Sequence, residues 1–303
     1  MREDEEDWRE YYVTPRYLAG SSFAGDPVFA DVPDTWPHYE PDDYGGRFVI
    51  TSPDRRIHIG WDGDGLDELW RIGAYEQPVG RLRWLVTANH ATPPEIIAGL
   101  TRALVNDYET GRDAFLDPPS PYWPHAAVPL LGAGWSRGAA RNGTVEILAP
   151  DHMAGLLINQ RALDPDDEVY TLWAGPPGYT RAQITFTART PSHLVAATAA
   201  AFSDPRPVVR ERRLMHPDVA HAVHLEPVSP APARPSTVPT PLDARRAAVS
   251  AALQRAQHLP GNGQDIRTAV ARTRNTGIRP SPTAIPQDVP TPPRHTQPGH
   301  PHR

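Results

Sequence analysis

Residues 50–54 read Ile-Thr-Ser-Pro-Asp, and residues 147–151 read Ile-Leu-Ala-Pro-Asp. When these two stretches are aligned at an offset of 97 residues, the flanking sequence also falls into register. The segment 190–196 then matches the segment 92–98. A period of about 98 residues is far too long for a solenoid repeat or a propeller blade, so it indicates a duplicated domain.

Each copy contains four stretches in which apolar residues alternate with polar or small ones. In the first copy the apolar positions are Phe48 and Ile50, then Ile57, Ile59 and Trp61, then Trp70, Ile72 and Ala74, then Leu82, Trp84, Val86 and Ala88. Alternation with a period of two predicts strands of a sheet that has one buried face and one face in water. Apolar spacing typical of a short helix precedes the strands at 28–36 and again at 127–135.

A helix with a marked start is expected to close each copy. Thr92 and Thr190 stand where an N-cap is expected, and Pro93 and Pro191 follow at the first helical position, where a missing N–H costs nothing. Glu95 stands three residues after Thr92, which predicts a capping box. We therefore expect an α+β protein with two tandem α-β-β-β-β-α units, each an antiparallel meander sheet covered by a helix. The two units are expected to pack against each other as a pseudo-twofold pair.

Composition divides the chain near Asp204. Residues 1–204 hold 16 Arg and 30 Asp or Glu, whereas residues 205–303 hold 14 Arg, 6 Asp or Glu, and no aromatic residue. A segment without aromatic anchors buries too little apolar surface to offset the entropy of ordering it, so a largely disordered Pro-rich tail is expected. The predicted division is an acidic disordered leader at 1–12, a first repeat at 13–110, a linker at 111–125, a second repeat at 126–210, and a tail at 211–303 with one helix at 243–258.

The composition also excludes several chemistries. The chain has no Cys, which rules out disulfides, thiolate zinc sites and a cysteine nucleophile. It has no Lys either, which rules out a Schiff-base or P-loop lysine. The first residues are acidic where a signal peptide is basic and then apolar, and no apolar run approaches the roughly 20 residues that span a bilayer. A cytoplasmic protein without membrane association is therefore expected.

Three stretches together resemble the SPDY domain family of actinobacteria. They are Val-Thr-Pro-Arg-Tyr-Leu-Ala-Gly at 13–20, Ser-Pro-Asp at 52–54, and Thr-Pro-Ser-His-Leu-Val-Ala-Ala at 190–197. The resemblance covers about residues 13–210 and implies two such domains in tandem. Because the function of this family is unknown, the resemblance implies an architecture and no activity. The tetrapeptide that names the family reads Ser-Pro-Asp-Arg in the first copy and Ala-Pro-Asp-His in the second, so both copies lack its tyrosine.

The two Pro-Asp turns are the most distinctive polar feature of the sequence. Pro53 and Pro150 set φ for the second position of a turn, and Asp54 and Asp151 can bond to the turn backbone. These properties explain both motifs as structural hairpin turns, and a ligand-binding role is the alternative.

Acidic loops and scattered histidines are the other polar features. Carboxylates cluster at 62–68 and at 164–168 and could bind Ca²⁺ or Mg²⁺, but the first cluster breaks the EF-hand pattern, so solvated loops are preferred. The histidines lack a recognisable metal spacing. We predict no catalytic residue, no metal and no cofactor.

Three functions are compatible with these features. The first is a non-enzymatic protein-interaction module with an unknown protein partner, which the duplication and the long tail favour. The second is a single-stranded nucleic-acid binding protein, by fold analogy with the tandem repeats of Whirly-type proteins. The acidic body argues against it, so nucleic acid would bind through the Arg-bearing tail. The third is a small-molecule binder or an enzyme without a recognisable motif. Trp61, Trp70, Trp84 and Trp173 are expected to pack in the core or on the sheet face, and the alternative is an exposed aromatic row that could stack bases or bind a protein partner.

Overall fold

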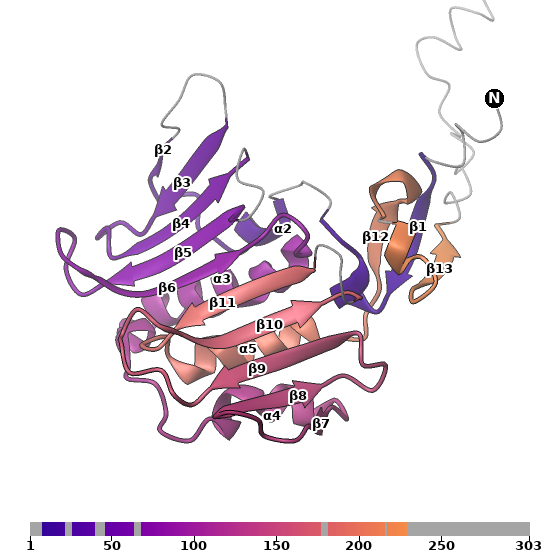
Figure 1. The fold of residues 1–303 in the computed structure, drawn as a ribbon. Coiled ribbons are helices and arrows are strands. Elements are labelled where there is room, and N and C mark those ends of the chain that lie inside the picture. Colours follow the sequence, from indigo (N-terminus) through magenta and orange to yellow (C-terminus); the bar gives the residue numbers. More distant parts are fainter. Residues whose placement is uncertain are drawn as a thin grey trace, which may run out of the picture. The chain divides into compact units, whose positions relative to one another are not determined.

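The computed structural model describes residues 8–21, 26–39, 46–63, 68–176, 181–215 and 217–228. All of them belong to one compact unit that ends at Pro230. They form a ten-stranded antiparallel sheet with helices on one face, and a separate three-stranded sheet (Figure 1). The expectations for residues 1–7 and for the tail from 229 onward, including the helix at 243–258, lie outside the described residues.

The two repeats have the same order of elements, so the predicted α+β tandem is confirmed. The first repeat consists of α2 (Asp26–Phe29), β2 (His38–Tyr39), β3 (Arg47–Thr51), β4 (Ile57–Asp62), β5 (Trp70–Tyr75), β6 (Leu82–Ala88) and α3 (Pro94–Glu109). The second consists of α4 (Pro124–Gly132), β7 (Ser136–Arg137), β8 (Thr144–Leu148), β9 (Ala154–Asn159), β10 (Glu168–Ala174), β11 (Ala182–Thr187) and α5 (Ser192–Phe202). The two-residue strands β2 and β7 at the outer edges were not expected.

The two four-stranded meanders join into one sheet through β6 and β11. The strand order is β2-β3-β4-β5-β6-β11-β10-β9-β8-β7, which is symmetric about its centre. At the junction Thr87 lies opposite Thr185, its counterpart in the other repeat, and their hydroxyls are 2.9 Å apart. A pseudo-twofold axis therefore passes between these two threonines.

The helices form a second layer that buries one face of the sheet (Figure 1). Inward-facing residues such as Ile59, Ile72 and Trp84 are buried, as the alternation predicted. The closing helices α3 and α5 pack directly against each other. A Cβ at Gly99 would lie 2.5 Å from the Cβ of Ala201, so only glycine allows the two helices to approach this closely.

The opening helices differ from the expectation in length and register. α2 has four residues, and turns lead from it to the buried Trp36. In α4 the buried residues are Ala126, Ala127 and Leu130, whereas Val128 and Leu131 of the expected apolar face are exposed. Pro124 in the first helical turn starts this helix earlier than the apolar spacing suggested, so a different side faces the core.

A three-stranded sheet changes the predicted domain boundaries. It consists of β12 (Val208–Glu211), β1 (Glu10–Thr14) and β13 (His224–Pro227), in that order. Residues 10–12 are therefore not part of a disordered leader, and the folded part runs to Val228 rather than ending at 210. Short 3₁₀ helices flank these strands: η1 (Arg16–Leu18), η3 (Arg212–Leu214) and η4 (Pro217–Val219); η2 (Ala114–Leu116) lies in the linker between the repeats. The strands pair across about 200 residues, and their small core combines both ends of the folded part around Val13 and Val208.

Candidate functional site

The first Pro-Asp turn lies between β3 and β4 and is held by its own side chains. The Ser52 hydroxyl donates to Oδ1 of Asp54 (2.6 Å) and accepts the backbone N–H of Ile57 (2.9 Å). Arg56 donates through Nε to Asp54 (2.5 Å) and through its two Nη atoms to Asp113 (2.8 and 2.6 Å). The turn is thereby tied to the segment that follows α3.

These ion pairs shift the pKa values of the groups involved. The hydrogen bond from Arg56 lowers the pKa of Asp113. Burial would raise the pKa of Asp54, but hydrogen bonds from Ser52 and Arg56 outweigh it and leave that pKa lowered. The pKa of Arg56 is raised, chiefly by its hydrogen bond to Asp113. All three groups are thus charged at neutral pH, and the network acts as a structural tie.

The second Pro-Asp turn, between β8 and β9, anchors a different segment. Oδ1 of Asp151 accepts the backbone N–H of Met153 (2.9 Å), and Oδ2 accepts the hydroxyl of Tyr17 (2.6 Å). Tyr17 is buried against Trp135 and Phe202. Burial and then the contact with Asp151 raise the pKa of Tyr17. Contacts within the protein therefore account for the aspartates of both turns.

The predicted N-caps at Thr92 and Thr190 are wrong. The helices begin one residue later than expected, so Pro93 and Pro191 occupy the N-cap positions without side-chain cap bonds. The buried hydroxyl of Thr92 instead lies 3.2 Å from the carbonyl of Gln183 on β11, across the repeat junction. The hydroxyl of Thr190 is buried and has no hydrogen-bond partner among the described residues.

The predicted capping box is also wrong, because Glu95 has a stronger partner. Its carboxylate accepts two bonds from the guanidinium of Arg210 on β12 (2.6 and 2.8 Å). Arg210 is buried and also donates to the carbonyl of Gly20. A buried bidentate ion pair outweighs a cap bond to a backbone N–H, and it fastens the three-stranded sheet to α3.

The face of the ten-stranded sheet that points away from α3 and α5, here called the open face, is the larger candidate surface. Trp70 and Trp84 point into the core, and Trp61 packs against its edge. Of the four tryptophans considered, Trp173 lies on the open face with its ring covered by the guanidinium of Arg181 at 4.4 Å, and Trp61 borders a hollow on that face. The strands therefore do not form an exposed aromatic row.

The first repeat has a hollow of about 400 Å³ on its open face. Its floor contains Gly60 on β4 and Gly73 on β5. A Cβ at Gly73 would lie 2.8 Å from Cδ1 of Leu82, and one at Gly60 would lie 3.2 Å from the carbonyl oxygen of Arg71. At Gly60 no side chain enters the hollow, whereas Gly73 is buried beneath Leu82, whose Cδ1 takes the place that a Cβ would occupy. This cavity is here called the first-repeat hollow. Besides the two glycines, it is lined by Arg47, Val49, His58, Trp61, Asp62, Arg71, Tyr75, Leu82 and Leu85.

The same place in the second repeat is filled. By strand pairing, Gly73 corresponds to Trp173, and Gly60 corresponds to Leu157. The indole of Trp173 lies so close to Gly155 that a Cβ there would be 2.7 Å from its Nε1. The hollow is thus a property of one repeat and not of the shared fold, and nothing in the sequence pattern singled out its two glycines.

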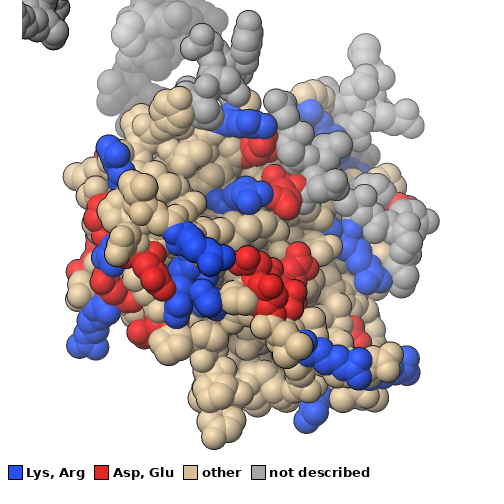
Figure 2. Space-filling model, turned by 60° about the vertical axis from the view of Figure 1, so that its left-hand side comes forward, with Lys and Arg blue, Asp and Glu red and all other residues tan. Residues whose placement is uncertain are grey.

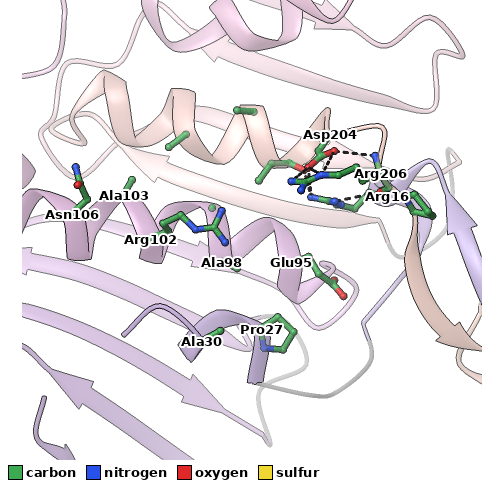
Figure 3. A pocket seen from close by; sticks show the side chains of 15 residues that line it. Arg16, Pro27, Ala30, Glu95, Ala98, Arg102, Ala103, Asn106, Asp204 and Arg206 are labelled. Carbon is green, nitrogen blue, oxygen red and sulfur yellow. Dashed lines mark hydrogen bonds and ion pairs between the residues drawn. The ribbon is translucent and has the colours of Figure 1, made fainter. Parts of the chain in front are cut away.

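A groove of about 850 Å³ lies on the opposite side of the molecule, between α3 and α5 (Figure 3). Its lining includes alanines and Gly99, Arg102 lies partway along α3, and Arg16, Asp204 and Arg206 meet at one end. There Asp204 binds Arg206 (2.6 Å) and the buried Arg16 (3.1 Å). The hydrogen bond from Arg206, helped by Arg16, lowers the pKa of Asp204 to about 2. One carboxylate thus pairs with two guanidinium groups, and alanine methyl groups line much of the rest of the groove.

Within the described residues, the acidic loops and polar pairs do not assemble into a metal or catalytic centre. In the second acidic loop, Oδ2 of Asp167 accepts the N–H groups of Leu163 and Asp164. In the first loop Asp62 and Glu68 form ion pairs with Arg47 and Arg71, and residues 64–67 lie outside the described part. Among the described residues, no group of three or more His, Asp or Glu side chains is placed to hold a metal ion.

Serine, histidine and aspartate do meet, but in separate pairs. Oγ of Ser120 lies 2.7 Å from Nδ1 of His125, while Oδ2 of Asp107 lies 2.6 Å from Nε2 of His193. The hydroxyl and the carboxylate therefore use different histidines, which is not the arrangement of a catalytic triad.

Charge is mixed rather than segregated on one face of the described part. On the face shown in Figure 2, Arg side chains lie next to Asp and Glu side chains, and neither kind gathers into a continuous patch. A nucleic-acid backbone requires a track of unpaired positive charge. In the described part of the chain, no helix is long and apolar enough to cross a membrane.

The fold and the sites define a tandem α+β protein without an assembled catalytic centre in its described part. Residues 51–109 and 149–208 each match the family SPDY, whose description is Domain of unknown function (DUF317). The chain therefore carries two SPDY domains in tandem, and each match spans the Pro-Asp turn region through the closing helix. Comparison with curated proteins gave no match. Comparison with solved structures likewise gave none.

Proposed function

We propose that this chain is a non-enzymatic protein-interaction module that binds a partner protein through the first-repeat hollow and the open face around it. The observation that carries the proposal is the hollow itself. It is a concave, largely apolar feature with a few polar groups at its rim, which is the chemistry of a site that accepts an anchor side chain.

The difference between the repeats supports the same reading. Both repeats bury equivalent faces against the helices, but among the described residues the first has a hollow on its open face where Trp173 fills the equivalent place in the second. A binding role explains this difference because a site used by one partner is needed only once. The tail could add further contacts, although it lies outside the described residues.

Single-stranded nucleic-acid binding is the weaker alternative. Trp173 is covered by Arg181, and the arginines Arg47 and Arg71 are already paired with carboxylates. Bases would thus find little free aromatic surface on the open face, and two arginines beside carboxylates do not form the track of positive charge that a nucleic-acid backbone follows.

A pair of matched variants of the full chain tests the proposal. Leu85 lines the hollow, and its counterpart across the pseudo-twofold axis is the exposed Gln183. The Leu85→Glu and Gln183→Glu variants introduce the same carboxylate at equivalent places. We expect Leu85→Glu to weaken binding to a partner isolated from the native host at least about tenfold by calorimetry, and Gln183→Glu to leave it unchanged.

Two other results would contradict the proposal. Equal affinity for the two variants would place the binding site elsewhere and overturn the proposal. Salt-sensitive binding of a labelled single-stranded DNA that Leu85→Glu abolishes would replace the protein partner by a nucleic acid.

A further inference from the structure

We propose that the first-repeat hollow recognises an apolar side chain flanked by carboxylates, so that the partner presents an acidic segment with an aromatic or large aliphatic anchor. This inference rests on the proposed function and specifies the chemistry of its partner. It follows from the different character of the floor and the rim of the hollow.

The walls select an apolar anchor. Val49, Leu82 and Leu85 supply aliphatic surface around the two glycines. The rings of Tyr75 and His58 pack against each other at 4.7 Å with an angle of 46° between their planes. The two tilted rings close one end of the hollow and do not form a parallel slot for a flat base. A single large side chain can therefore enter over Gly60, beside Leu82 and Leu85, and exchange water for apolar contacts.

The rim selects negative charge. Arg71 lies directly opposite Gly60 in the paired strands, and Arg47 lies opposite Asp62 at the end of β3. Nη1 of Arg71 donates to Glu68 (2.9 Å) and Nε of Arg47 donates to Asp62 (3.1 Å). Both arginine side chains are about 60% exposed, at 61% and 60%. Exposed pairs of this kind contribute little to stability, so carboxylates of a bound partner can replace them or add to them at small cost.

The positive rim does not continue across the sheet. The counterparts of Arg71 and Arg47 in the second repeat are Thr171 and Thr144, and Thr87 and Thr185 lie between the two halves. A nucleic-acid strand needs repeated phosphate contacts along its path, whereas a short acidic peptide needs them only beside its anchor. The local pair of arginines therefore fits the peptide better.

Nuclear magnetic resonance titrations of the ¹⁵N-labelled full chain test this inference. The probes are acetyl-Asp-Phe-Asp-amide, the matched peptides with Asn or Lys in place of Asp, and a thymidine pentanucleotide. We expect the Asp peptide to shift the amide signals of Gly60 and Gly73 and to bind at least about fivefold more tightly than the Asn peptide. The Lys peptide and the pentanucleotide should leave these signals in place.

A variant with reversed charge at Arg71 tests whether this residue causes the preference for carboxylates. Arg71→Glu should reverse the preference, so that the Lys peptide binds more tightly than the Asp peptide, whereas Thr171→Glu at the equivalent position should change nothing. Since Arg71 is exposed, neither variant should disturb folding. Equal binding of the three peptides, a preference that survives Arg71→Glu, stronger shifts with the pentanucleotide, or no shift with any probe would each overturn the inference. If a host partner nevertheless depends on Leu85, the proposed function stands and only the partner chemistry is wrong.

Discussion

Neighbouring residues on one strand show how the two repeats differ. Ile72 and Gly73 on β5 correspond to Leu172 and Trp173 on β10. Ile72 and Leu172 both point toward the helices, and each is an aliphatic residue that is essentially inaccessible to water. Gly73 and Trp173 both belong to the open face, and they are the smallest and the largest residues available. Packing fixes the chemistry of the buried side, whereas the open side can diverge without loss of the fold.

The largest expected difference in stability between equivalent substitutions in the two repeats lies in the core, at Trp84. Trp84 is fully buried and donates through Nε1 to the carbonyl of Phe115 (2.7 Å), whereas its counterpart on β11 is Ala182. We expect Trp84→Ala to lower the free energy of unfolding by about 3–5 kcal/mol, because it leaves a large cavity and an unpaired carbonyl. Ala182→Gly should cost about 1 kcal/mol or less. Urea denaturation of both variants checks this, and similar losses would contradict it.

The two Pro-Asp turns should give smaller, separable effects. Asp54→Ala and Asp151→Ala are each expected to cost about 1–2 kcal/mol, because both remove hydrogen bonds to partly buried groups. Amide hydrogen exchange should distinguish them. Asp54→Ala should speed exchange in the linker near Asp113, and Asp151→Ala should speed it around Tyr17. The same exchange pattern in both variants would show that the turns do not anchor separate segments.

Equivalent positions near the C-terminal ends of α3 and α5 should contribute differently to the pH dependence of folding stability. Asp204 follows α5, whereas the corresponding residue of the first repeat is Asn106. Since the pKa of Asp204 is lowered to about 2 in the folded chain, its contribution is fully present above its ordinary pKa near 3.8 and is lost as the pH falls toward 2. Asp204→Asn should therefore flatten the dependence of stability on pH between about 4 and 2, and Asn106→Asp should leave it nearly unchanged. Denaturation midpoints across this range measure the slope, and an unaltered slope in Asp204→Asn would contradict the assignment.

The smallest effect concerns a backbone feature that both turns share. Arg55 and His152 follow the two Pro-Asp pairs with φ values of 59° and 57°, in the left-handed region. Replacement of either residue by Gly relieves this strain but increases the entropy of the unfolded chain. We expect each variant to be more stable by about 0–1 kcal/mol, with the same sign in both repeats. A loss above about 1 kcal/mol in only one of them would show that its side chain makes a contact the other lacks.

The sequence predicts the repeated part of this protein better than its sites. Alternation identified the strands because Ile57, Ile59 and Ile72 alternate over a sheet with one dry face. The caps at Thr92 and Thr190 failed because both helices begin one residue later than expected, and the capping box failed because Glu95 pairs with the distant Arg210. The three-stranded sheet was missed because its strands join residues about 200 positions apart, beyond any local pattern. The first-repeat hollow was missed for a different reason, since a glycine in a strand has no periodic signature.

The threonine pair at the centre of the sheet also bears on the origin of the chain. A single repeat expressed alone would expose the whole edge of β6, an unpaired strand of seven residues. Two such chains could satisfy each other only by joining at that edge, which would make a symmetric homodimer with two identical surfaces. Fusion of the two repeats in one chain makes their association permanent, and the two halves can then differ in sequence. One half could then fill its surface with Trp173 while the other kept Gly73 and an open site.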